Sequence, residues 1–390
     1  MVKKRYIAYL IFTVAICYVI SPWIFEKKIL FNELLSATGA VIFIYKRFRF
    51  GRDAISIGIV LLLIWGSFHI VTSLFRMDNI YYYLRNTVII YSVMTFFIGY
   101  YLLKYLDGFI SFINTGLKIY LITFLFLPVH HYFFERFSTS TLFPALVRNV
   151  KPFLVPSIIV SLNIVLAINY DSSTAIILAA FYIIVFIAPG YKFFKQVALV
   201  SLLAFICVFI YLLPNLDLIK LRYSPYTYNA IYDVINSHPL LAIDGNSTWR
   251  LVLWKQIIVD LFPYNLLGFG FGTPLLRYYP VEDFSKLDSL PYILGAHNSY
   301  VYLFGRLGLI YILLILGIYA KIFKEYFYHK VYYLANKQNL IFLSFFAISV
   351  IALFNPTLES PIYAGMYWLL LGFTARCIHD RHYSTEYNPR

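Results

Sequence analysis

The chain has 390 residues, of which 61% are hydrophobic and 13% are charged. A soluble domain of this length needs far more polar surface, so the composition indicates a lipid environment and excludes an ordinary soluble fold. The formal net charge is +14, but the basic residues form short clusters between apolar runs. This distribution is typical of cytoplasmic segments of membrane proteins and argues against a nucleic-acid partner.

Apolar runs long enough for membrane helices recur along the whole chain, since a hydrocarbon core of about 30 Å requires about 20 apolar residues per helix. They are continuous rather than alternating, which predicts helices and not a β-barrel. We interpret the first run as a transmembrane helix because it lacks a small-residue cleavage site. The runs are residues 6–24, 29–45, 54–74, 88–106, 109–129, 153–168, 174–188, 197–213, 299–319, 340–354 and 362–373.

The basic clusters at residues 46–52 and 192–195 should both be cytoplasmic, yet an odd number of apolar runs separates them. A short or re-entrant element within residues 131–150, where Arg136 and Arg148 dilute the apolar signal, would restore an even number. We therefore expect an all-α polytopic membrane protein with about 12 transmembrane helices and both termini in the cytoplasm.

The long stretch after the eighth run is too polar for the bilayer and is expected to form one large loop on the outer side. The predicted organisation is an N-terminal transmembrane bundle (1–215), this loop (216–296), C-terminal transmembrane helices (297–376) and a tail (377–390). We expect the tail to be cytoplasmic and disordered. The three cysteines, Cys17, Cys207 and Cys377, have no metal-ligand or paired spacing, and no metal site is predicted.

Two groups of residues in and beside the loop stand out. The first begins with Ser247 and Thr248, either of which can cap an amphipathic helix that carries Arg250 and Trp254; the glycines Gly268, Gly270 and Gly272 follow. The second is the run of residues 295–299, Gly-Ala-His-Asn-Ser, which enters an apolar helix containing Gly-Arg-Leu-Gly at residues 305–308. The glycines permit close approach to a ligand or tight packing, and both alternatives remain open.

These two groups together resemble the O-antigen ligase and polymerase family of membrane glycosyltransferases, with the motif part covering about residues 171–308. The resemblance implies a GT-C-like, metal-independent enzyme without a cofactor in the bacterial inner membrane. It further implies an undecaprenyl-diphosphate-linked oligosaccharide as donor and transfer at a periplasmic active site. Besides the lipid bilayer, a chain-length regulator and a flippase are the partners that it suggests.

The resemblance assigns catalytic roles to Arg250 and His297. A guanidinium can clamp the phosphate oxygens of the leaving group, although an interfacial arginine can also simply snorkel. An imidazole can accept the proton of the attacking hydroxyl or only hydrogen-bond the acceptor. Substrate-binding roles are expected for Arg222, Asn298, Trp254, Gly268, Gly270 and Gly272.

One departure from the family pattern concerns a second arginine, usually found in a Ser-Arg pair before the helix at residues 174–188. This sequence has Ser172, Ser173 and Thr174 there. Arg222 is the preferred replacement, ahead of Arg136 and Arg148.

Three functions remain open. Polymerase and ligase share these motifs, and the tyrosine-rich, compact chain favours a polymerase of lipid-linked repeat units over a ligase that transfers glycan to the lipid A core. A flippase for lipid-linked oligosaccharides would instead require broken helices and charged residues within the membrane. The span centres carry only occasional ionisable residues such as His69, and the polar motif residues gather in one outer loop, which favours the enzyme.

Overall fold

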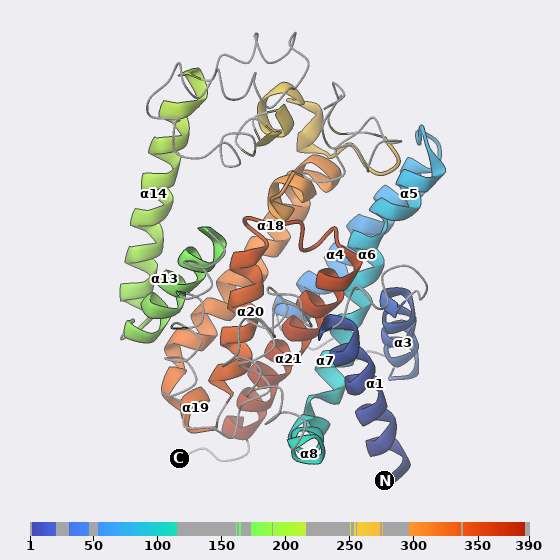
Figure 1. Cartoon of the computed structure of the whole chain (residues 1–390), viewed down its shortest axis with the longest axis vertical. Coiled ribbons are helices and arrows are strands. Elements are labelled where there is room, and N and C mark those ends of the chain that lie inside the picture. The colour runs from blue at the N-terminus through green and yellow to red at the C-terminus, as the bar shows by residue number, and fades with distance from the viewer. Residues whose placement is uncertain are drawn as a thin grey trace.

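The computed structural model describes residues 2–20, 31–46, 54–114, 161, 164, 173–188, 190–215, 250, 253–254, 256–273, 275, 296–336 and 338–386. All regular elements in these ranges are helical (Figure 1). The element predicted within residues 131–150 and most of the loop, including Arg222, lie outside the described residues.

Where the structure describes them, the helices follow the predicted apolar runs, but most of the runs 109–129 and 153–168 lies outside the described residues. The α-helices are α1 (Val2–Ile20), α3 (Phe31–Tyr45), α4 (Ala54–Ser73), α5 (Ile80–Asn86), α6 (Val88–Tyr91), α7 (Thr95–Leu102), α8 (Leu106–Phe112), α13 (Ser173–Ile187), α14 (Tyr191–Asn215), α18 (Ser299–Tyr328), α19 (Lys330–Ala335), α20 (Asn339–Ile351) and α21 (Pro361–Glu386). Three short 3-10 helices and one short π-helix are also present. The 3-10 helices are η1 (Ser92–Met94), η2 (Leu103–Tyr105) and η4 (Tyr264–Leu266), and the π-helix is η3 (Gln256–Asp260).

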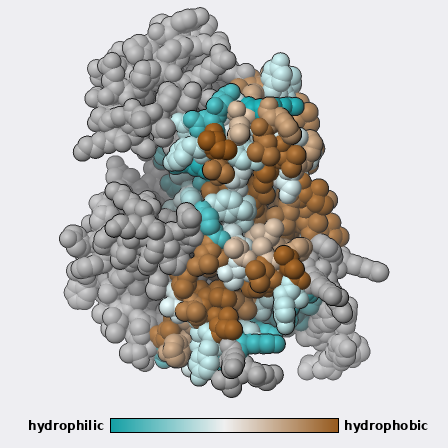
Figure 2. Space-filling view, turned by 90° about the vertical axis from the view of Figure 1, so that its right-hand side faces the viewer, coloured by the Kyte–Doolittle hydropathy of each residue, from teal (hydrophilic) through white to brown (hydrophobic). Residues whose placement is uncertain are grey.

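Three helical segments in the described part of the chain are long and apolar enough to cross a membrane: Ala54–Ser73, Ile80–Phe112 and Ser299–Tyr328. Shorter apolar helices occupy Asn32–Tyr45, Ala175–Ile187 and Asn339–Ile351. Large apolar side chains remain exposed on α4 and α18, and Figure 2 shows apolar residues gathered on one face of the molecule. These features support the predicted helical membrane class, while the number of spans stays a prediction.

Helices α7 and α21 pack so closely that glycines lie at their contact. A Cβ at Gly99 would lie 2.2 Å from the carbonyl oxygen of Leu369, and one at Gly372 would lie 2.1 Å from that of Phe96. Small residues that allow backbones to approach are typical of helix contacts in membranes. Helix α3 packs beside these helices. The side-chain amide of Asn32 donates a hydrogen bond to the hydroxyl of Ser92 in η1, just before α7, at 2.9 Å.

Helical turns continue across the boundary between the predicted runs 88–106 and 109–129. Helix α8 crosses it, and helical turns continue from Ile80 to Phe112. Gly108 does not end the helix but packs against α1, where an added Cβ would lie 2.4 Å from the hydroxyl of Tyr9. Contact with another helix thus outweighs the helix-breaking tendency of glycine.

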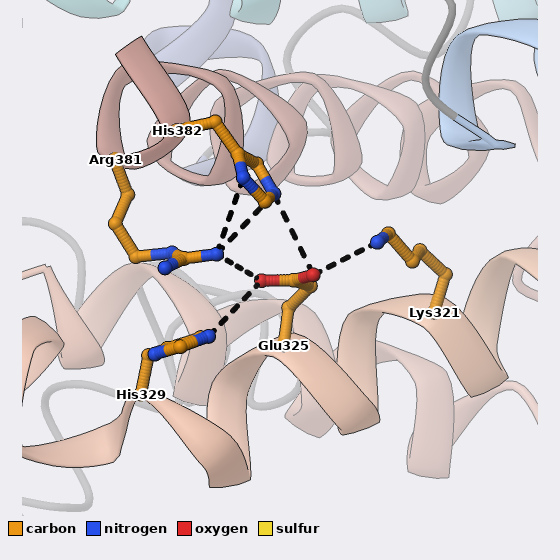
Figure 3. Close-up of polar contacts among 5 residues, drawn as sticks. All are labelled: Lys321, Glu325, His329, Arg381 and His382. Atoms are coloured by element: carbon orange, nitrogen blue, oxygen red, sulfur yellow. Dashed lines mark hydrogen bonds and ion pairs between the residues drawn. The ribbon is translucent and has the colours of Figure 1, made fainter. Parts of the chain in front are cut away.

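The expectation of a disordered tail after Cys377 is wrong, because α21 continues to Glu386. Arg381 on this extension donates to Glu325 on α18 at 2.7 Å, and both side chains are only 8% exposed. Lys321 binds the other carboxylate oxygen at 2.8 Å, and two histidines complete the cluster (Figure 3). A buried carboxylate requires such partners, and pairing with α18 therefore orders a segment whose polarity alone suggested disorder.

Helix α18 bends sharply at Gly308, where φ is 78° and ψ is −175°. On a straight helix Tyr300 and Tyr319 would be about 28 Å apart, because each residue adds about 1.5 Å. Their hydroxyl oxygens instead lie 2.5 Å apart, and the hydroxyl of Tyr319 contacts that of Tyr367 on α21 at 2.7 Å. The first two turns of α18 are therefore folded toward the rest of the helix.

Candidate functional site

A hydrogen bond joins the turn that carries Arg250 and Trp254 to the Gly-Ala-His-Asn-Ser run. The indole N–H of Trp254 donates to the carbonyl oxygen of Ala296 at 2.8 Å, across 42 residues. Trp254 is 7% exposed, and it follows Arg250 by four residues, the spacing at which helical side chains share a face. The described contact gives Trp254 the role of fixing the arginine-bearing turn beside the histidine-bearing one, and its predicted contact with substrate stays a prediction.

The charge of Arg250 affects the protonation of His297. Burial lowers the pKa of His297, and the positive charge of Arg250 lowers it further. The imidazole is therefore neutral at pH 7, with a nitrogen lone pair available to accept a proton. The two residues are therefore close enough to interact electrostatically, and their catalytic roles stay predictions.

The backbone at His297 is held in a rare conformation, with φ of 50° in the left-handed region. Next to it, Asn298 caps α18: its side-chain oxygen accepts hydrogen bonds from the N–H groups of Tyr300 at 3.0 Å and Val301 at 3.1 Å. Such a cap fixes where the helix begins. These contacts give Asn298 a role in holding this junction, and its expected contact with substrate stays a prediction.

The glycine loop, residues 268–273, is inserted between α4, α5 and the bend of α18. Its N–H groups donate to these helices, and two of its carbonyl oxygens accept from the guanidinium of Arg306 on α18. The bonds from the loop are Phe269 to Gly305 O at 2.9 Å, Gly270 to Arg306 O at 2.8 Å, Phe271 to Ser73 Oγ at 2.8 Å and Gly272 to Asn86 Oδ1 at 3.3 Å.

These contacts complete the hydrogen bonding of the bend. The bend at Gly308 frees helix carbonyls that would otherwise accept from the next turn. The loop supplies donors for Gly305 and Arg306, and the indole N–H of Trp65 on α4 donates to Leu307 at 2.6 Å. The loop and the bend therefore stabilise each other.

The glycines of the loop leave no room for side chains. Their φ values are 93°, 75° and 83°, and an added Cβ would lie 2.6 Å from backbone atoms of α18 at Gly268, 2.2 Å from Ser73 at Gly270 and 2.6 Å from Met77 at Gly272. These contacts favour the packing alternative of the sequence analysis. The described N–H groups of the loop bind the surrounding helices. A contact between these glycines and substrate stays a prediction.

Arg306 is a residue whose role the sequence analysis missed. It is 4% exposed, and its Nη1 donates to the carbonyl oxygens of Gly270 at 3.1 Å and Thr273 at 2.5 Å. The guanidinium also lies over the ring of Tyr302, 5.1 Å from its centroid. A lone arginine inside an apolar helix is a sufficient signal of such a role, because an ionised group there requires a partner.

The second arginine of the site is not located. Arg222, Arg136 and Arg148 lie outside the described residues. In the part of the chain that the structure describes, no three residues of the types His, Cys, Asp and Glu come together as a metal-ligand set. The absence of a metal requirement stays a prediction.

With this geometry in place, comparison with known protein families is informative. Residues 157–316 match the model of the O-antigen ligase family. This segment of the chain is similar to the O-antigen ligase family. The matched residues include Arg250, Trp254, the glycine loop, His297 and the bend of α18, so the resemblance to the O-antigen ligase and polymerase family is confirmed. Neither the curated proteins nor the solved structures gave a significant match. The match supports a function of the ligase or polymerase type, and the helical fold supports a membrane location.

Proposed function

We propose that this protein is a metal-independent polysaccharide polymerase that joins repeat units carried on undecaprenyl diphosphate, at the periplasmic face of the bacterial inner membrane. One observation supports the proposal: Arg250 and His297 come from separate motifs, yet they are close enough that the guanidinium lowers the pKa of the imidazole. The proposed architecture is GT-C-like, with about 12 spans and both termini in the cytoplasm.

Arg250 and His297 have different roles in the proposed reaction. A hydroxyl oxygen of the acceptor glycan attacks the anomeric carbon of the donor, and the bond from that carbon to the diphosphate oxygen breaks. The electron pair of that bond passes to the diphosphate, whose growing negative charge Arg250 neutralises with a planar pair of N–H donors. His297 accepts the proton of the attacking hydroxyl.

The chemistry is tested by single-turnover transfer with purified protein and lipid-linked donor. Loss of a general base typically slows a reaction about a hundredfold to ten-thousandfold, and we expect His297→Ala to fall in this range. Asn298→Ala should cost less because it removes only a helix cap. EDTA should not change the wild-type rate. A wild-type rate in His297→Ala, or loss of activity with EDTA, would show that the mechanism is wrong.

The second candidate is a ligase that moves finished glycan to the lipid A core, and the family match fits it equally well. Gel analysis of lipopolysaccharide from a strain that lacks the gene distinguishes the polymerase from the ligase. Core carrying a single repeat unit indicates a lost polymerase. Bare core with accumulated lipid-linked polymer indicates a lost ligase.

A flippase is less well supported. The bend of α18 and the buried Arg306 are features expected of a transporter. However, Nη1 of Arg306 binds two carbonyl oxygens of the glycine loop, which gives this charge a role in the fold. Vesicles that contain the purified protein should transfer glycan without moving lipid-linked donor across the bilayer.

The orientation is tested with a cysteine at Asn246 in a variant whose three native cysteines are replaced. An impermeant maleimide should label this cysteine in intact spheroplasts. Labelling only after lysis would place the site in the cytoplasm.

A further inference from the structure

A carboxyl group from a distant part of the chain reaches the His-Asn-Ser motif. Glu359 lies in the segment between α20 and α21, and one of its carboxyl oxygens, Oε2, is 2.5 Å from the hydroxyl oxygen of Ser299. Ser299 is the last residue of the motif and the first of α18. The N–H of Ser299 also donates to Ala352 at 2.9 Å, so the motif is bound to this segment at two points.

The hydroxyl of Ser299 is fully used. Its oxygen accepts hydrogen bonds from the N–H groups of Thr357 at 2.8 Å and Leu358 at 2.9 Å. A serine hydroxyl has two lone pairs and one proton, so the proton remains for donation. The carboxyl of Glu359 at 2.5 Å is a closer acceptor than the carbonyl oxygen of Asn355 at 3.2 Å.

The second carboxyl oxygen of Glu359, Oε1, has a different environment from Oε2. Oε1 is buried and has no hydrogen-bond partner among the residues that the structure describes, although the residue as a whole is half-buried. An unpaired oxygen of a buried carboxylate costs free energy. Burial accordingly raises the pKa of Glu359 to about 7, against the opposing effect of the bond from Ser299. Because Oε2 already receives the serine proton, the proton of the neutral acid belongs on Oε1.

Among the described residues, burial and not a charged neighbour raises the pKa of Glu359. The titratable groups beside the contact along the chain are His297 and Tyr300 on either side of Ser299 and Tyr363 in the first turn of α21. None of them contributes to the shift in the pKa of Glu359, which arises from burial and is opposed by hydrogen bonds from Ser299 and the local backbone.

We infer that Glu359 is a positioning residue of the proposed transfer site: through Ser299 it holds the turn that carries His297, and it holds that turn more firmly when ionised. A hydroxyl donates a stronger hydrogen bond to a carboxylate than to a neutral acid, and a separation of 2.5 Å is within the range of such charge-assisted bonds. The inference rests on the proposed function, because positioning is of consequence only if His297 serves in transfer.

The test is the pH dependence of single-turnover transfer by the full-length protein between about pH 5.5 and about pH 8.5. We expect the wild-type rate to rise about fivefold through about pH 7, which is the gain of a charge-assisted over a neutral hydrogen bond. Glu359→Gln keeps an oxygen acceptor for Ser299 but cannot ionise, so its rate should stay at the lower level without this rise. Glu359→Ala should fall below it.

Glu33→Gln is the matched control, since Glu33 accepts a bond of 2.5 Å from the hydroxyl of Tyr91 away from the motif. The control should keep the wild-type pH profile. If Glu359→Gln also shows the wild-type rise, the positioning role is overturned.

Hydrogen exchange separates this inference from the proposed function. After correction for intrinsic exchange, protection of the N–H groups of Tyr300 and Val301 should increase through about pH 7 in the wild type but not in Glu359→Gln. If the wild type transfers no glycan, the proposed function fails, whereas a pH-dependent protection lost in the glutamine variant would still support the link. Equal protection in both proteins would overturn it.

Discussion

The imidazole of His297 is partly buried beside the guanidinium of Arg250, and its pKa is lowered first by burial and then by that charge. A lowered pKa keeps the imidazole neutral to lower pH, so transfer should be lost only as the pH falls below the ordinary histidine value of about 6.5. Residual single-turnover activity of Arg250→Gln, which lacks the charge, should show its acid limb at higher pH than that of Arg250→Lys. An acid limb at the same pH in both variants would disprove this electrostatic coupling.

Arg250 should be sensitive even to a change that keeps its charge. The lysine of Arg250→Lys is a point charge and cannot place two parallel N–H donors on a diphosphate. We expect this variant to retain little polymer formation and Arg250→Ala to retain none, while both insert into the membrane normally. Polymer length on gels, at membrane abundance matched by immunoblot, is the measurement. Near wild-type polymer in the alanine variant would mean that Arg250 only snorkels at the interface.

Gly270 should not tolerate a methyl group. Its φ is 75° and a Cβ would lie 2.2 Å from Ser73, so strain and overpacking together should cost about 2–4 kcal/mol in Gly270→Ala. Gly317 on α18 is the control, because no atom of the described residues lies within 4 Å of its Cβ position. Gly317→Ala should be neutral or slightly stabilising. Thermal unfolding in detergent compares the two variants, and equal midpoints would contradict the packing described for the loop.

The end of α21 should contribute to stability. Arg381→Met leaves Glu325 buried with Lys321 as its remaining close cation, and we expect a loss of up to about 3 kcal/mol. Arg376→Met removes a pair with Asp380 whose partners are 30% and 42% exposed, so it should cost less than about 1 kcal/mol. Adding Glu325→Leu to Arg381→Met should recover most of the loss. Thermal unfolding that does not distinguish Arg381→Met from Arg376→Met would exclude a stabilising ion pair.

The sequence was sufficient for the helical membrane class, because each span leaves a continuous apolar run. It also singled out Arg250 and His297 from their motifs, and their catalytic roles stay predictions. It was insufficient where partners lie far apart along the chain. Trp254 binds Ala296 across 42 residues, and Arg306 binds Gly270 across 36. Such bonds produce no local periodicity. The bend at Gly308 escaped prediction for a related reason, since apolar composition is the same on both sides of it and the donors that permit it come from other helices.

The hydrogen bonds of the glycine loop limit how segments of this protein can be exchanged. An outer segment exchanged between two related chains would bring N–H donors without the acceptors that receive them, which belong to α4, α5 and α18. Chimaeras intended to change sugar preference should therefore carry positions 65, 73, 86 and 305–308 together with the grafted loop. By the same reasoning the loop, expressed alone, would lack the scaffold on which it folds.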